Sequence, residues 1–85
     1  MGMEILLTFD STYAAIESER ILLQAGLAVK VMNLPSSIRA GCGISLRIAP
    51  DDFLRATQLL GSVGPFGAYR RCVAGGKSTY SPYSI

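Results

Sequence analysis

Two stretches of alternating apolar residues, each followed directly by a segment that favours a helix, constrain the fold of this chain more than any other feature. Residues 4–9 and 43–48 carry an apolar side chain at every second position, as a strand with one buried face does. Serine and threonine after the first stretch are good helix caps, and Pro50 with two aspartates after the second is a good helix start. The sequence therefore predicts two strand–helix units.

The remaining segments complete a β-α-β-β-α-β order. The expected elements are a strand at 4–9, a helix at about 12–25, strands at 27–33 and 43–48, a helix from about 50 that Gly61 or Gly64 ends, and a weaker strand at 66–73. This order predicts an α+β fold of the ferredoxin-like, split βαβ type. It consists of a four-stranded antiparallel sheet with both helices on one face.

Rules for connections between strands then predict which strands are neighbours. Right-handed crossovers are expected to place strands 4–9 and 43–48 side by side at the centre, as a parallel pair in an otherwise antiparallel sheet. Strand 66–73 should pair with strand 4–9, and strand 27–33 with strand 43–48. We expect the face away from the helices to be open, or to be covered by a partner such as a second copy of the chain.

Length and composition indicate one small domain. The chain has 85 residues, of which 49% are hydrophobic, and this argues against disorder. We expect a domain over residues 1–73 and a flexible C-terminal tail over residues 74–85, which are rich in glycine, serine, tyrosine and proline. A net charge of +2 offers no strongly basic surface for nucleic acid.

The same totals predict a location and limit the chemistry. No apolar run approaches the roughly 20 residues that span a bilayer, and no secretory signal is recognisable, so we expect a cytoplasmic protein with reduced thiols. The chain has no histidine, which is the commonest general base and metal ligand. The two cysteines are too few for a disulfide framework and too far apart in sequence for a zinc knuckle. We expect no metal or cofactor, and a carrier or binding protein more than an enzyme.

The loop before the third expected strand contains the candidate functional residue, Cys42. Gly41 and Gly43 flank it and should leave its sulfur unshielded. Arg39 is near enough in sequence to favour the thiolate, and Pro35 should stiffen the start of the loop. Two interpretations are open: a presented, reactive thiol, or a small apolar side chain buried where a strand begins.

Cys72 is the second thiol. In the expected sheet it lies at the same end as Cys42, two strand spacings or about 10 Å away. A disulfide tolerates a Cα separation of only ~7 Å, so pairing would require the loop to move. Cys72 is therefore either a candidate resolving thiol or a half-buried cysteine without a chemical role.

Several of these segments together resemble a known family. They are Thr8–Thr12, Ala15, Glu19, Asn33–Pro35, Cys42–Arg47 and Pro50–Asp52. Over about residues 3–71, the chain resembles the small bacterial selenium/sulfur carrier-like proteins, most specifically in the unit of proline, loop, Cys-Gly and strand. The resemblance implies that a cysteine, here Cys42, holds sulfur or selenium as a persulfide or selenopersulfide.

Two functions follow. In the first, the Cys42 thiolate accepts the atom from a cysteine desulfurase-type or selenium-donor protein and passes it to an acceptor protein, by the chemistry of disulfide exchange. In the second, the chain is a regulatory or scaffold module that binds a small ligand or a partner through the open face of its sheet. The second function would tolerate Cys42→Ser but not changes to Lys30 or Arg47, which lie on that face.

Overall fold

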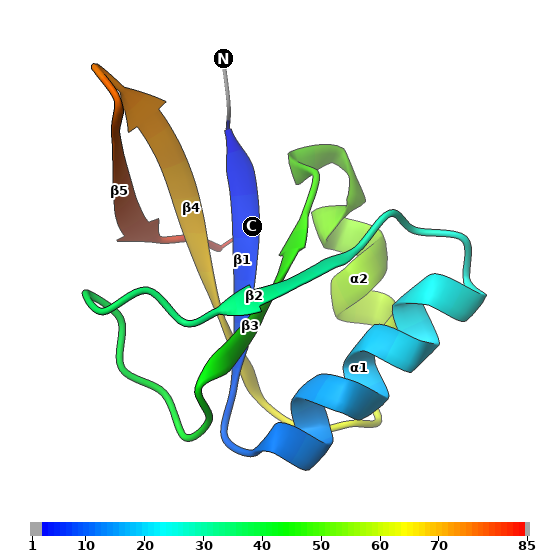
Figure 1. Ribbon diagram of the computed structural model, residues 1–85. Coiled ribbons are helices and arrows are strands. Elements are labelled where there is room, and N and C mark those ends of the chain that lie inside the picture. The colour runs from blue at the N-terminus through cyan, green and yellow to red at the C-terminus, as the bar shows by residue number, and fades with distance from the viewer. Residues whose placement is uncertain (1–2, 85) are drawn as a thin grey trace.

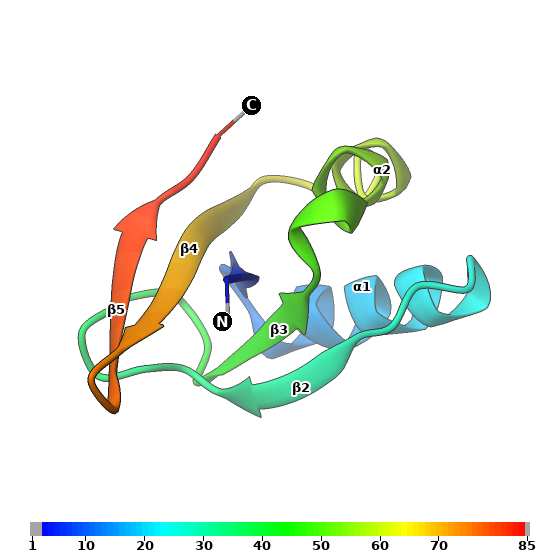
Figure 2. The ribbon, with the colours of Figure 1, turned by 90° about the horizontal axis from the view of Figure 1, so that it is seen from above.

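The computed structural model describes residues 3–84, which form one sheet with helices α1 and α2 packed on the same face (Figures 1 and 2). Residues 1 and 2 of the expected domain and residue 85 of the expected tail lie outside this range. The elements are β1 (Glu4–Phe9), α1 (Thr12–Gln24), β2 (Lys30–Asn33), β3 (Ile44–Ile48), a 3-10 turn (Pro50–Asp52) that leads into α2 (Phe53–Leu59), β4 (Phe66–Ala74) and β5 (Lys77–Pro82). No helix within this range is long and apolar enough to cross a bilayer.

Strand β1 is at the centre of the sheet and is buried on both faces. Ile5 and Leu7 alternate with Leu6 and Thr8, and all four side chains are buried. Ile5 and Leu7 belong to the main core beneath the helices. Leu6 lies on the other face, where its partners across the strands are Arg47 and Tyr69. Because Leu6 has no exposed surface, the centre of this face is covered by the chain's own residues, and it is not open as expected.

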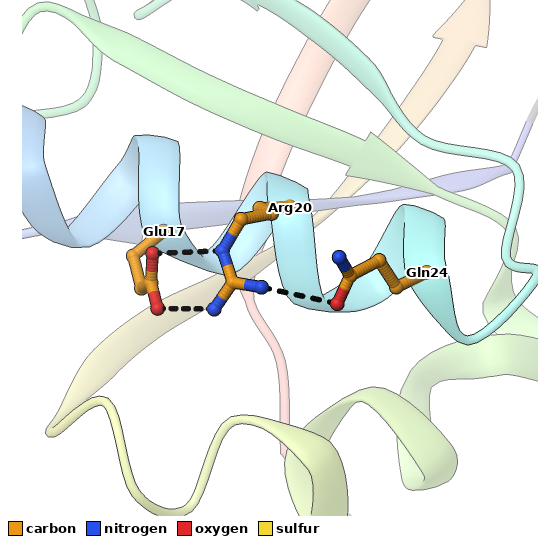
Figure 3. Close-up of polar contacts among 3 residues, drawn as sticks. All are labelled: Glu17, Arg20 and Gln24. Atoms are coloured by element: carbon orange, nitrogen blue, oxygen red, sulfur yellow. Dashed lines mark hydrogen bonds and ion pairs between the residues drawn. The ribbon is translucent and has the colours of Figure 1, made fainter.

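Helix α1 begins and ends as the sequence predicts. The Ser11 hydroxyl accepts a hydrogen bond from the Ala14 N–H at 3.1 Å, and Gly26 has a φ of 87° just beyond the helix. On the exposed face, the Arg20 guanidinium donates hydrogen bonds to the Glu17 carboxylate and the Gln24 side chain (Figure 3). The hydrogen bond from Arg20 lowers the pKa of Glu17.

The strand order is β2-β3-β1-β4-β5, and every neighbouring pair is antiparallel. The expected pairing of β2 with β3 and of β4 with β1 is present. The expected parallel pairing of β1 with β3 is wrong, because Leu7 pairs with Leu46 in an antiparallel register. Helix α1 joins the parallel strands β1 and β2, and β3 lies between them. Helix α2 joins the parallel strands β3 and β4, and β1 lies between them. In both cases the inserted strand is antiparallel to its two neighbours.

The segment expected to be a flexible tail instead forms the fifth strand, so the four-stranded prediction is corrected. Gly75 and Gly76 adopt positive φ values of 59° and 80°, which suit a two-residue hairpin turn. Strand β5 then pairs with β4 along its whole length. The expected domain boundary after residue 73 falls inside β4.

Tyr83 attaches the end of the chain to the helical layer. Its N–H donates a hydrogen bond to the Ala68 carbonyl at 2.9 Å. Its ring meets the Phe53 ring of α2 edge to face, with the centroids 4.9 Å apart. The residues after β5 therefore contribute to the core that the helices cover.

Tyr83→Ala is expected to lower the free energy of unfolding by about 1–2 kcal/mol, since it removes an aromatic pair and the apolar surface that the pair buries. Tyr13→Ala is the matched control, because the Tyr13 side chain is 77% exposed and its removal should have almost no effect. Urea unfolding curves measure both values. Equal losses for the two variants would contradict the packing role of Tyr83.

Candidate functional site

Cys42 lies two residues before β3, at the end of the sheet where β1 finishes. Its side chain is only 8% exposed and belongs to the main core. The sulfur donates a hydrogen bond to the Ile44 carbonyl at 3.3 Å. The expectation of an unshielded sulfur is therefore wrong for this conformation. Core residues that are distant in the sequence cover the sulfur. The small size of Gly41 and Gly43 has no influence on this packing.

The loop of residues 34–43, which we call the cysteine loop, borders a wide-open hollow that Cys42 helps to line. It extends away from the helices before it returns to β3 (Figures 1 and 2). Its base is closed by a hydrogen bond from the Leu34 N–H to the Gly43 carbonyl at 2.9 Å. The hollow has a volume of about 420 Å³ and is lined by Leu34, Ser36, Ile38, Arg39, Ala40, Gly41, Cys42 and Gly43. Cys42 is thus a buried residue that also borders this space.

Ile38 is the main side-chain anchor of the cysteine loop. It is 6% exposed, whereas the neighbouring residues Ser37 and Arg39 are exposed. Its N–H donates a hydrogen bond to the Pro35 carbonyl at 3.0 Å, which forms a turn at the start of the loop. Pro35 therefore takes part in this turn, as its expected stiffening role requires. Arg39 borders the hollow and makes no ion pair with any residue from 3 to 84.

Gly41 has a different role from the one that the sequence suggested. A Cβ at this position would overlap the backbone of Asp10, the residue before the N-cap of α1. Glycine is needed here because the loop passes directly against the connection between β1 and α1. Gly43 has open space where a Cβ would lie, and its φ is not positive. The two glycines that flank Cys42 are therefore not equivalent.

Gly41→Ala is expected to destabilise the protein by about 1–3 kcal/mol, because backbone must shift to admit the methyl group. It should also raise the rate at which Cys42 is alkylated, since the displaced backbone is adjacent to the cysteine. Gly43→Ala is the control and should change neither quantity appreciably. Urea unfolding and timed iodoacetamide labelling measure the two effects. A Gly43→Ala variant as disturbed as Gly41→Ala would contradict this assignment.

Cys72 lies at the opposite end of the sheet from Cys42, which corrects the expected placement at one end. Strands β3 and β4 both run antiparallel to β1, so they are parallel to one another. Arg71 pairs with Glu4 at the start of β1, and Cys72 lies one residue further on. Cys42 lies beyond the other end of β1. The separation along the strands is roughly 25 Å at ~3.3 Å per residue, far more than a disulfide tolerates.

Mild oxidation is therefore expected to give no intramolecular disulfide between Cys42 and Cys72. Under native conditions Cys42 should also be alkylated at least about tenfold more slowly than half-buried Cys72, and urea should remove the difference. Peptide mass mapping without reduction tests the first statement, and timed alkylation tests the second. Detection of a monomer with a Cys42–Cys72 bond would show that this register is wrong.

Two features that shape the site were not predicted from the sequence: the burial of Ile38 and the packing of Gly41 against Asp10. Ile38 could have been noticed, because it is an apolar residue among polar and small ones in the loop. The contact between Gly41 and Asp10 has no sequence signal, because it joins two backbone segments that are distant in the chain. Among residues 3–84, no three acidic, cysteine or histidine side chains gather closely enough to hold a metal ion.

The fold and the site together define a small α+β domain with a buried cysteine near the end of a long loop. A family model described as "Putative Se/S carrier protein-like" matches residues 4–64, a range that includes the cysteine loop. The chain belongs to this Se/S carrier protein-like family. Strands β4 and β5 lie outside the matched range.

One curated relative is the uncharacterized protein YtiA of Escherichia coli (strain K12). It is 35% identical to this chain over 43 residues, which are 51% of this chain and 51% of the relative. The chain thus spans about half the length of that relative. No solved structure matches the chain.

Proposed function

We propose that this protein carries a sulfur or selenium atom on Cys42 and passes it between partner proteins. The observation that carries the proposal is that Cys42 borders the hollow of the cysteine loop, within the range that the family model matches. The description of the family names selenium and sulfur carriers, which supports this type of cargo. Because the thiol is 8% exposed, the proposal requires a second conformation in which the cysteine loop is displaced.

Exposure of Cys42 requires the loss of a small set of contacts. Ile38 and Cys42 would leave their buried positions, the Cys42 sulfur would lose its hydrogen bond to the Ile44 carbonyl, and Gly41 would move away from the Asp10 backbone. Segments with few buried contacts open locally at a small fraction of the cost of global unfolding. Burial in the resting state would protect the thiol from oxidation, and docking of a partner on the loop would expose it.

Arg39 borders the same hollow as Cys42. A cation beside a cysteine stabilises the thiolate, which is the nucleophile in persulfide exchange. We therefore propose that Arg39 assists the transfer once the cysteine loop opens, in a chain that has no histidine to act as a general base.

The transfer needs no oxidant and no cofactor. The Cys42 thiolate attacks the terminal sulfur of a donor's persulfide, and a new S–S bond forms at Cys42. The bond between the two donor sulfurs breaks, and the donor cysteine leaves as a thiolate. An acceptor thiolate then attacks the terminal sulfur on Cys42 in the same way, and Cys42 returns to the thiolate. A selenium atom takes the place of the transferred sulfur in the corresponding selenium reaction.

We propose a reducing compartment such as the cytoplasm for this exchange.

Incubation with a cysteine desulfurase loaded with persulfide should add the mass of one sulfur atom to the native protein at Cys42. Cys42→Ser should abolish the gain, and Cys72→Ser should preserve it. Ile38→Ala should speed the initial transfer, because it weakens the anchor of the cysteine loop. Intact mass spectrometry followed by peptide mapping measures these outcomes. If a known acceptor protein is loaded in the same assay and Cys42 is not, the carrier function is wrong.

A further inference from the structure

A second cavity lies at the other end of the sheet, beside the start of β1. Its volume is about 220 Å³. Five of its lining residues are apolar, namely Met3, Ala28, Ile48, Ala49 and Pro50, and three are charged, namely Glu4, Lys30 and Arg47. Cys42 lies beyond the opposite end of β1, so the carrier chemistry does not use this cavity.

The charges around this cavity are unbalanced. Lys30 and Arg47 are directly opposite one another on β2 and β3, an arrangement of like charges that by itself destabilises a sheet. The one carboxylate beside them, Glu4, is shared between two arginines. Its oxygens lie 3.3 Å from Arg47 Nε and 2.5 Å from Arg71 Nη1. Glu4 is thus paired with two arginines, and within residues 3–84 Lys30 forms no ion pair.

Arg47 is held in place but retains free hydrogen-bond donors. Its side chain is 24% exposed, and its closest approach to the Glu4 carboxylate is from Nε, at 3.3 Å. Among the side-chain hydrogen bonds of arginines within residues 3–84, none involves the two terminal nitrogens of Arg47. A guanidinium that is already oriented by one carboxylate can bind a second anion in bidentate geometry at low entropic cost. Lys30 is the cross-strand partner of Arg47 on β2.

We propose that this cavity binds a small organic monocarboxylate with an apolar body. The terminal nitrogens of Arg47 and the ammonium of Lys30 hold the carboxylate, and Met3, Ala49 and Pro50 contact the apolar body. The size is sufficient, because a cavity of about 150 Å³ is known to hold benzene. The inference is independent of the proposed transfer of sulfur or selenium at Cys42.

Benzoate is a suitable probe, and benzamide is its neutral counterpart of nearly the same shape. We expect benzoate to give saturable shifts of the backbone amide NMR signals of Lys30, Arg47 and Ala49 in the full chain at constant ionic strength. Benzamide should bind at least about tenfold more weakly, since it lacks the charge that Arg47 recognises. Inorganic phosphate should bind more weakly than benzoate, because it has no apolar body. Phosphate binding as tight as that of benzoate would overturn the proposal.

Matched variants identify the two cations. Arg47→Gln should weaken benzoate binding about tenfold and Lys30→Gln about threefold. The controls are Arg70→Gln and Lys77→Gln, which remove exposed charges away from the cavity and should leave binding unchanged. Lys30→Gln remains informative if Arg47→Gln fails to fold, because Lys30 is exposed and forms no ion pair in the described range.

The results also separate this site from the carrier site. Cys42→Ser should bind benzoate as the native protein does, whatever its behaviour with a persulfide donor. Absence of saturable shifts in the native protein would overturn the proposal. Equal effects of Lys30→Gln and Lys77→Gln would do the same.

Discussion

The antiparallel position of β1 between β3 and β4 is the constraint on which the rest of the structure depends. All its residues from Ile5 to Phe9 are buried, so it contributes to the layer under the helices and to the opposite face at once. Because both neighbours run against it, the beginning of β3 and the end of β4 lie at opposite ends of the sheet. This geometry separates Cys42 from Cys72. It also separates the hollow beside Cys42 from the cavity beside Glu4.

The sequence predicted the elements that apolar periodicity and caps specify. Strands β1 and β3 and the Ser11 cap of α1 follow from local patterns, and the pairing of β2 with β3 follows from the rules for connections between strands. The direction of β1 relative to β3 was mistaken, because the crossover rule concerns the strands that a helix joins and not the strand inserted between them. Strand β5 was missed because Lys77–Pro82 has no apolar alternation. Its pairing follows from the Gly75–Gly76 turn.

The candidate site was predicted by residue type but not by environment. Cys42, Gly41 and Arg39 do lie together at one hollow. Whether a cysteine at the start of a strand is covered depends on residues far along the chain, and neighbouring glycines carry no information about them. Of the two interpretations of Cys42 that the sequence left open, the structure shows the buried thiol.

The family match ends at residue 64, and a protein fragment that ends there would not contain the whole fold. A fragment cut there would lose both strands on one side of β1 and the aromatic contact at Tyr83. The apolar strand at the centre would become an exposed edge, with a row of unpaired backbone groups that readily recruits other chains. The region that the family model matches is therefore shorter than the unit that folds in this chain. Expression boundaries for this protein are better chosen from the last paired strand than from the end of the match.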